Sequence, residues 1–204
     1  GSEVRLKQAV KRIVVEEGRA VGVELKNGDR INARVVLSNL DKPATFLRLL
    51  EEKCVEEGFL ADVREIEHKG AWVHLLFKLK GLPSYGGEWE GMNRDIHERF
   101  GGAMVPDPEE MQASYEACLR GELPGHVPVA FQIPSIEDET LAPPGFHIAS
   151  AYGFFFPCDA PDSERGKLRD EMAEKVIDRI TSFMPDFRER IVEKAVFSSD
   201  HFAA

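Results

Sequence analysis

The sequence has 204 residues, of which 43% are apolar and 9% aromatic, and its formal net charge at pH 7 is −10. A chain of this length and composition can bury a hydrophobic core as one large or two small domains. It has no apolar run of the roughly 18 residues that a membrane-spanning helix needs, and its first residues lack the pattern of a signal peptide. The acidic balance argues against a nucleic-acid partner, because surfaces that bind nucleic acid are normally basic.

Residues 3–37 predict a meander of short β-strands. Alternating apolar and polar residues predict strands at 4–6, 9–15, 20–25 and 31–37. Asn27 and Gly28 give a strong hairpin signal between the last two strands. A small sheet of this kind cannot bury both of its faces alone, so it is expected to dock on another element.

The stretch 35–46 predicts a buried strand that leads into a helix. Val35, Val36 and Leu37 form a continuous apolar run, which is typical of a strand covered on both faces. Asp41 is expected to cap the helix, and Pro43 fits its first turn. Junctions of this kind bind nucleotides in open α/β sheets, although most strand-to-helix junctions bind nothing.

The rest of the chain mixes helices and strands. Apolar spacing predicts helices at 42–50, 56–66, 108–120 and 162–184, and strands at 71–79, 127–133, 146–156 and 191–197. The glycine-rich stretch 81–102 reads either as a functional lid or as a loosely ordered surface loop. The whole pattern predicts an α+β fold in which a β-meander is followed by a mixed, largely antiparallel sheet covered by helices.

Two of these strands have a face suited to the wall of a ligand cavity. Trp72 and His74 lie opposite the apolar face of strand 71–79. Regular alternation in strand 146–156 places six residues on one strongly aromatic face: Phe146, Ile148, Ser150, Tyr152, Phe154 and Phe156. We predict that Trp72, His74, Tyr152 and Phe154 line a substrate site. The alternatives are a histidine that is hydrogen-bonded on a sheet face and aromatic residues that belong to an ordinary core.

No catalytic or metal-binding motif stands out in the sequence. There is no Gly-x-Ser-x-Gly, His-Glu-x-x-His, Cys-x-x-Cys or phosphate-binding glycine loop. The three cysteines, Cys54, Cys118 and Cys158, are far apart and predict ordinary thiols in a reducing compartment. We therefore assign no catalytic residue and no metal ligand, and an independent hydrolase lacks a nucleophile paired with a base.

The order of features resembles that of a known family. The segment 10–29, followed by 35–39, is similar to the middle of flavin-dependent oxidoreductases of the phytoene-desaturase and amine-oxidase superfamily. Further stretches are similar to the branch named for pyridine nucleotide-disulfide oxidoreductase domain-containing protein 2, namely 134–135, 138–147 with its Leu-Ala-Pro-Pro-Gly loop, 184–187 and 191–192. The resemblance covers nearly the whole chain.

The resemblance implies a division of the chain by function. Residues 1–41 would be part of a split flavin-binding domain, 42–190 the substrate-binding domain, and 191–204 the start of a return to the flavin domain. The glycine fingerprint of the family's amino-terminal domain and its carboxyl-terminal glycine-rich segment do not occur in this sequence. In the complete protein, Ser38 and Asn39 would lie near the flavin. The chain has Asp41-Lys42-Pro43 where relatives often have Asp-Pro, which shifts the helix start.

The resemblance also implies a function. We expect FAD in the complete protein and none in this central fragment, which alone would be inactive. The parent protein would remove hydride from a small apolar or amine-like substrate. The alternative is a stand-alone ligand-binding or protein-interaction module without catalysis that uses the aromatic face of 146–156. We expect no transmembrane segment, a homodimer formed through an exposed sheet edge, and a cytoplasmic location, or the mitochondrial matrix if the source is eukaryotic.

Overall fold

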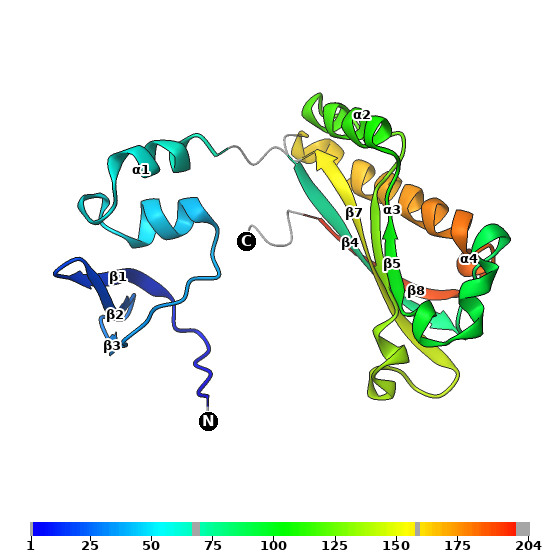
Figure 1. Ribbon diagram of the computed structural model, residues 1–204, viewed down its shortest axis with the longest axis horizontal. Helices are drawn as coiled ribbons and strands as arrows, with labels where there is room; N and C mark the ends of the chain where they lie inside the picture. Colours follow the sequence, from blue (N-terminus) through cyan, green and yellow to red (C-terminus); the bar gives the residue numbers. More distant parts are fainter. Residues whose placement is uncertain (1, 67–69, 158–159, 199–204) are drawn as a thin grey trace. The chain divides into compact units, whose positions relative to one another are not determined.

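The computed structural model describes residues 2–66, 70–157 and 160–198 (Figure 1). The chain divides into two compact units, Gly1–Glu67 and His68–Ala204. Two antiparallel sheets and several helices make up these units, which confirms the predicted α+β class. None of the helices in the described ranges combines the length and the apolar character needed to cross a membrane.

The first unit begins with the predicted meander. Strands β1 (Val10–Glu16), β2 (Arg19–Leu25) and β3 (Arg30–Asn32) form an antiparallel sheet in the order β1-β2-β3. Glu17 and Gly18 turn the chain with positive φ angles of 49° and 75°, which matches the twist of a tight hairpin. The Asn27–Gly28 hairpin joins β2 to β3 as predicted.

Two short helical elements and one α-helix complete the first unit. These are η1 (Ala44–Leu49), η2 (Glu52–Cys54) and α1 (Glu57–Arg64). The predicted cap is confirmed, because the Asp41 carboxylate accepts a hydrogen bond from the Ala44 N–H at 2.6 Å. Leu60 and Val63 of α1 are buried, and Phe59 meets Phe46 of η1 edge to face with ring centroids 4.8 Å apart.

The prediction of strands at 4–6 and 35–37 is wrong for this chain. Neither segment pairs in a sheet, and Val35 and Leu37 are 71% and 93% exposed. The chain leaves the meander after Ala33, whose N–H donates to the Val21 carbonyl. An apolar run needs flanking strands to become a buried strand, and the described residues supply none beside it.

The boundary between the two compact units differs from the predicted boundaries of the functional domains. The helices at 44–64 share a compact unit with the meander, although the sequence assigned them to the substrate domain. The segment at 191–197 pairs inside the second sheet. The assignment of 1–41, 42–190 and 191–204 to flavin-binding or substrate-binding roles stays a prediction.

The second unit is built on an antiparallel sheet of five strands in the order β5-β6-β7-β4-β8. Its strands are β4 (Gly70–Lys80), β5 (Gly101–Met104), β6 (Val129–Gln132), β7 (Phe146–Pro157) and β8 (Ile191–Phe197). The stretch predicted as irregular contains η3 (Gly87–Arg94) and η4 (His97–Arg99) before β5. Two further short elements, η5 (Pro134–Ile136) and η6 (Glu139–Leu141), precede β7.

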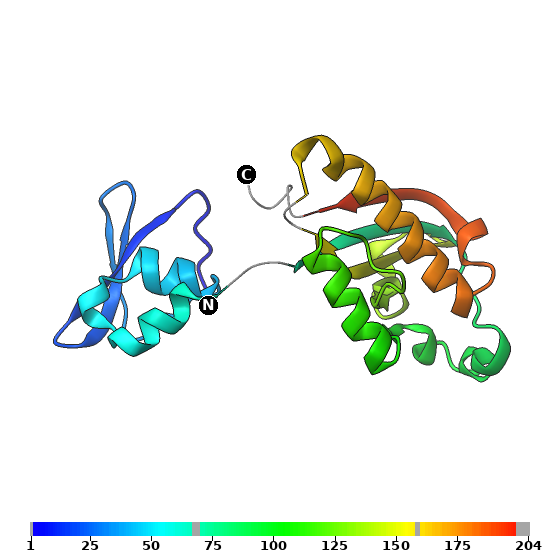
Figure 2. The ribbon, with the colours of Figure 1, turned by 90° about the horizontal axis from the view of Figure 1, so that it is seen from above.

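One face of this sheet carries the core, beneath the long helix α3 (Asp162–Phe183) (Figure 2). Val73, Leu75, Phe77 and Leu79 of β4 are at most 1% exposed, as the predicted alternation requires. Gly153 lets α3 approach β7, because a Cβ atom there would lie 2.4 Å from Cγ2 of Val176. The short helix α4 (Phe187–Arg190) then leads into β8.

A bulge in β7 changes which residues share a face. Ala71 pairs with Phe156 and Trp72 pairs with Phe154, so Phe155 is an extra residue with a φ of 67°. The bulge moves Phe156 to the core face, where it is fully buried. The prediction that Phe156 shares a face with Tyr152 and Phe154 is therefore wrong, because regular alternation cannot anticipate an inserted residue.

Helix α2 (Pro108–Leu119) begins where the sequence predicted. The Asp107 carboxylate accepts from the Glu110 N–H at 2.9 Å, and Pro108 occupies the first turn. The helix buries Ser114, Ala117 and Cys118. Cys54 is exposed, and Cys158 lies outside the described residues.

Candidate functional site

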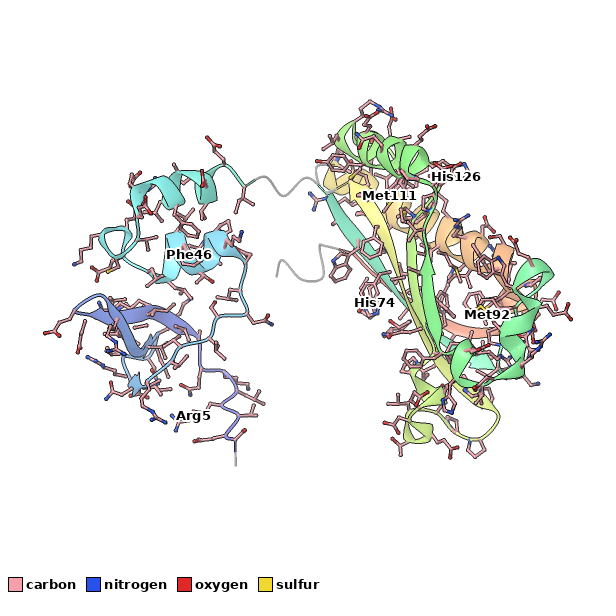
Figure 3. The ribbon with its side chains drawn as sticks, in the orientation of Figure 1. Arg5, Phe46, His74, Met92, Met111 and His126 are labelled. Atoms are coloured by element: carbon pink, nitrogen blue, oxygen red, sulfur yellow. The ribbon has the colours of Figure 1, made fainter. Side chains whose placement is uncertain are left out.

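The candidate site lies on the face of the five-stranded sheet opposite α3, which we call the open face. Cross-strand partners share a face, so the pairing gives its rows of side chains. One row joins Trp72 to Phe154, and the next runs from Ala130 through Tyr152 and His74 to Phe197. Figure 3 shows His74 projecting from the sheet on the side away from α3.

All four predicted substrate-lining residues lie together on this face: the rings of Trp72, His74 and Tyr152 are in contact, and Phe154 is the cross-strand partner of Trp72, so we call the four the aromatic cluster. His74 stacks on Tyr152 with ring centroids 4.2 Å apart and 6° between the ring planes. Trp72 meets Tyr152 edge to face at 5.2 Å. Trp72 and Phe154 are 38% and 37% exposed, which is more than an ordinary core allows. Whether the cluster binds a substrate stays a prediction.

His74 is the polar member of this cluster. Its Nε2 lies 2.9 Å from the hydroxyl oxygen of Ser150, which is 6% exposed. Partial burial lowers the pKa of His74, because desolvation disfavours the charged ring. The lowered pKa favours the neutral form of the ring. His74 is hydrogen-bonded on a sheet face, which was the alternative to a ligand-binding role. Because it also lies on the open face, this hydrogen bond does not exclude contact with a ligand.

The other end of the open face carries charge. Lys78 Nζ lies 2.9 Å from a carboxylate oxygen of Glu193 and 5.3 Å from the centroid of the Phe146 ring. These two charged residues border a shallow cavity of about 290 Å³ with Leu76, Ile148 and Ala195. The open face therefore grades from an aromatic end to a charged end.

Sequence reasoning missed part of the cluster. Phe197 of β8 lies 6.1 Å from His74, between ring centroids, and Ala130 of β6 neighbours Tyr152. Both strands were predicted, but a single sequence does not say which strand pairs with which. The apolar residues Val196 and Phe197 at the end of a predicted strand were the available signal. The order of the strands in the sheet was the missing information.

The two predicted cofactor-binding residues lie in the first unit. The Ser38 hydroxyl is 2.7 Å from the Thr45 hydroxyl, in a mainly apolar groove. The groove has a volume of about 390 Å³, and its lining also includes Ile13, Phe46 and Leu50. Asn39 lines an adjoining cavity of about 320 Å³. Ser38 also lines this second cavity, so both residues border it, and their role toward a flavin stays a prediction.

The described residues do not fit the pyrophosphate of a dinucleotide at this junction. A pyrophosphate needs free N–H groups at a helix amino terminus and a close glycine backbone. Here the Asp41 carboxylate already occupies that end of the helix, where it accepts from the Ala44 N–H. Its negative charge would repel a phosphate. No group of three or more metal-ligating side chains occurs within the described ranges either.

Comparisons with known proteins agree with the resemblance seen in the sequence. No protein-family model matches the chain. Pyridine nucleotide-disulfide oxidoreductase domain-containing protein 2 of Mus musculus is 26% identical over 213 residues, which cover 97% of this chain and 35% of the mouse protein. Phytoene desaturase (neurosporene-forming) of Cereibacter sphaeroides is 27% identical, over 99% of this chain and 37% of its own length. Prolycopene isomerase of Daucus carota is 28% identical, over 96% of this chain and 29% of its own length.

A solved structure supports the fold. An oxidoreductase from Methanosarcina mazei matches 95% of this chain and 37% of its own length with a TM-score of 0.52 at 15% identity. The chain thus spans about a third of the length of the relatives that it matches. Together these similarities confirm the predicted resemblance: the chain is similar to a partial segment of a phytoene desaturase, a prolycopene isomerase and a pyridine nucleotide-disulfide oxidoreductase domain-containing protein.

Proposed function

We propose that this chain is the substrate-binding segment of a larger flavin-dependent oxidoreductase, and that the open face forms one wall of its substrate cavity. The observation that carries the proposal is the half-exposed aromatic cluster of Trp72, His74, Tyr152 and Phe154. Aromatic walls with few polar groups are typical of small-molecule sites. The substrate would be apolar or amine-like, and the complete protein would remove hydride from it.

FAD in this proposal belongs to the complete protein. When bound, the flavin supplies the hydride chemistry. The segment described here would contribute the wall that orients the substrate and excludes water from it. The carboxylate of Asp41 at the helix start supports a division of labour in which other parts of the protein hold the pyrophosphate.

Flavin binding gives a first test of the proposal. The protein encoded by the complete open reading frame that contains this sequence is expected to purify with one equivalent of bound flavin, measured by its absorbance. The 204-residue chain, incubated with FAD and passed through gel filtration, is expected to emerge colourless. A complete protein without flavin, or a yellow isolated chain, would contradict the proposal.

The role of the aromatic cluster is tested by bleaching of the flavin under anaerobic conditions with a panel of apolar and amine compounds. Trp72→Ala is expected to raise the substrate concentration for half-maximal bleaching by about tenfold, because it removes contact area in the cavity. Trp89→Ala is the matched control, since Trp89 lies on η3 and is 43% exposed. Equal effects of both variants would remove the support for the open face.

The second candidate is a binding or interaction module that acts without catalysis, and the same aromatic cluster would then carry a ligand or partner. A reading frame confined to these residues would favour that function. The proposed location remains the cytoplasm, or the mitochondrial matrix in a eukaryote.

A further inference from the structure

A cavity on the open face lies beside Tyr152, on the side opposite His74. It has a volume of about 310 Å³ and is lined by Phe100, Gly101, Gly102, Ala130, Phe131, Gln132 and Tyr152. That volume is at the small end of the ~300–1,000 Å³ typical of small-molecule sites. The cavity is therefore large enough for one flat ring system.

The row of cross-strand partners explains why one face of the Tyr152 ring is available. The row runs Ala130, Tyr152, His74 across β6, β7 and β4. His74 covers one ring face in a nearly parallel stack. On the other side the neighbour is an alanine, whose single methyl group leaves space above the sheet. A flat group entering there would stack on Tyr152 as His74 does from the opposite side.

Beside the cavity, a glycine lets β5 pair closely with β6. A Cβ atom at Gly101 would lie 2.1 Å from the Phe131 carbonyl oxygen, so only glycine fits at this position. Gly102 pairs with Phe131, whose side chain lies in the core, so the side of Gly102 that would carry a Cβ atom faces away from the open face. On the open face, the small side chain of Ala130 therefore leaves the space of the cavity, beside the paired part of β5 and β6.

The chemistry of the lining selects an uncharged ligand. None of its seven residues is charged, and its polar side-chain groups are the Gln132 amide and the Tyr152 hydroxyl. Glu193 and Lys78 lie at the other end of the open face and form an ion pair with each other. A box for an organic cation needs several ring faces turned toward one point, whereas Tyr152 has already given one face to His74.

We propose that this cavity binds a flat, uncharged ring of the substrate, with one hydrogen-bonding group directed at the Gln132 amide. The inference rests on the proposed function and narrows its substrate class: a neutral molecule is selected over a permanently charged ammonium compound. Ala130 sets the depth of the cavity, and Gln132 sets the polarity that it accepts.

The test uses three matched probes and the 204-residue chain, with dissociation constants measured by equilibrium dialysis. The probes are naphthalen-2-ylmethanol, 2-ethylnaphthalene and trimethyl(naphthalen-2-ylmethyl)ammonium. The alcohol is expected to bind about tenfold more tightly than the ammonium compound. Ala130→Leu, which fills the cavity, is expected to weaken binding of the alcohol about tenfold, whereas Ala130→Ser leaves it within about twofold. Thermal unfolding followed by circular dichroism confirms that each variant folds.

Gln132 is tested by one apolar and one isosteric change. Gln132→Leu is expected to raise the dissociation constant of the alcohol about fivefold and to change that of 2-ethylnaphthalene by less than about twofold. Gln132→Glu is expected to tighten binding of the ammonium probe, which a merely structural residue would not do. A wild-type chain that prefers the ammonium probe, or that binds none of the probes, would overturn the inference.

The failure of the inference can be told apart from failure of the proposed function. If Phe154→Ala weakens binding of the alcohol while Ala130→Leu does not, the open face binds apolar ligands outside this cavity. The cavity assignment is then wrong, and the proposed function stands. If the complete protein carries no flavin, the proposed function fails whatever the probes do.

Discussion

His74 on β4 and Tyr152 on β7 form a parallel stack with a centroid distance of 4.2 Å, and Ser150 holds the histidine in place from two residues away on the same strand as the tyrosine. Stacked pairs contribute about 0.5–1.5 kcal/mol beyond their buried area. A double-mutant cycle with His74→Leu and Tyr152→Leu is expected to give a coupling free energy in that range, measured by urea unfolding. Tyr152→Phe keeps the ring and should preserve the coupling; a coupling near zero would show that the stack is incidental.

The pH dependence of stability follows from the histidines. Partial burial lowers the pKa of His74 and of His147. The positive charge of Arg99 lowers the pKa of His147 further. Between the lowered pKa and the ordinary value near 6.5, the unfolded chain binds more protons than the folded chain. The free energy of unfolding should therefore fall as the pH drops from 7 through 6.5 toward the lowered pKa values. Urea unfolding at several pH values measures this slope, and His74→Gln should reduce it.

His97 provides a control of opposite sign. A hydrogen bond from its ring to the Glu137 carboxylate, with Nδ1 and Oε1 2.7 Å apart, raises the pKa of His97. The stability from this pair is present at low pH and is lost as the pH rises through the raised pKa. His97→Gln should therefore steepen the fall in stability toward acid. If His97→Gln and His74→Gln change the slope in the same direction, the assignment of one of them is wrong.

Gly153 and Gly166 should respond in opposite directions to alanine. At Gly153 the added methyl group would lie 2.4 Å from Val176, between β7 and α3, and overpacking of a core costs about 1–3 kcal/mol. At Gly166, on the exposed side of α3, a Cβ atom meets nothing within 4 Å. Alanine there should stabilise the chain by about 0.5–1 kcal/mol, because it favours the helix. Chemical unfolding of both variants measures the difference, and a neutral Gly153→Ala would show that α3 can shift.

Leu37 tests the corrected interpretation of the segment 35–37. Because Leu37 is 93% exposed in this chain, Leu37→Ser should change the free energy of unfolding by less than about 0.5 kcal/mol. A buried leucine in the predicted strand would cost about 2–5 kcal/mol instead. In the complete protein, where the proposed flavin domain would flank this segment, the same substitution is expected to be destabilising. Urea unfolding of both proteins distinguishes the two environments.

Most of the secondary structure could be predicted from local patterns. The alternation in β4, the Asn27–Gly28 hairpin and the Asp107 cap depend on residues close in sequence, and all three occur in the structure. The failures depend on partners distant in sequence. Whether Val35 is buried is decided by strands beside it, and a run of apolar residues carries no information about whether those strands are present.

The candidate site was predictable only in part, for the same reason. Trp72, His74, Tyr152 and Phe154 were found because each strand showed an aromatic face. The cavity beside Tyr152 escaped notice because it depends on the small side chain of Ala130, which neighbours Tyr152 on the open face. A cavity of this kind depends on which strands lie side by side in the folded sheet. A small residue therefore indicates a cavity only when the strand order is known.

The bulge at Phe155 bears on how the chain can vary in length. It adds one residue to β7 while Phe154 stays on the open face and Phe156 stays in the core. A relative that lacks this residue would keep both faces of the sheet, with its strand shortened by one position before α3. Insertion or deletion at this point can therefore occur without exchanging interior and exterior side chains, so alignments of β7 should allow a single-residue gap here.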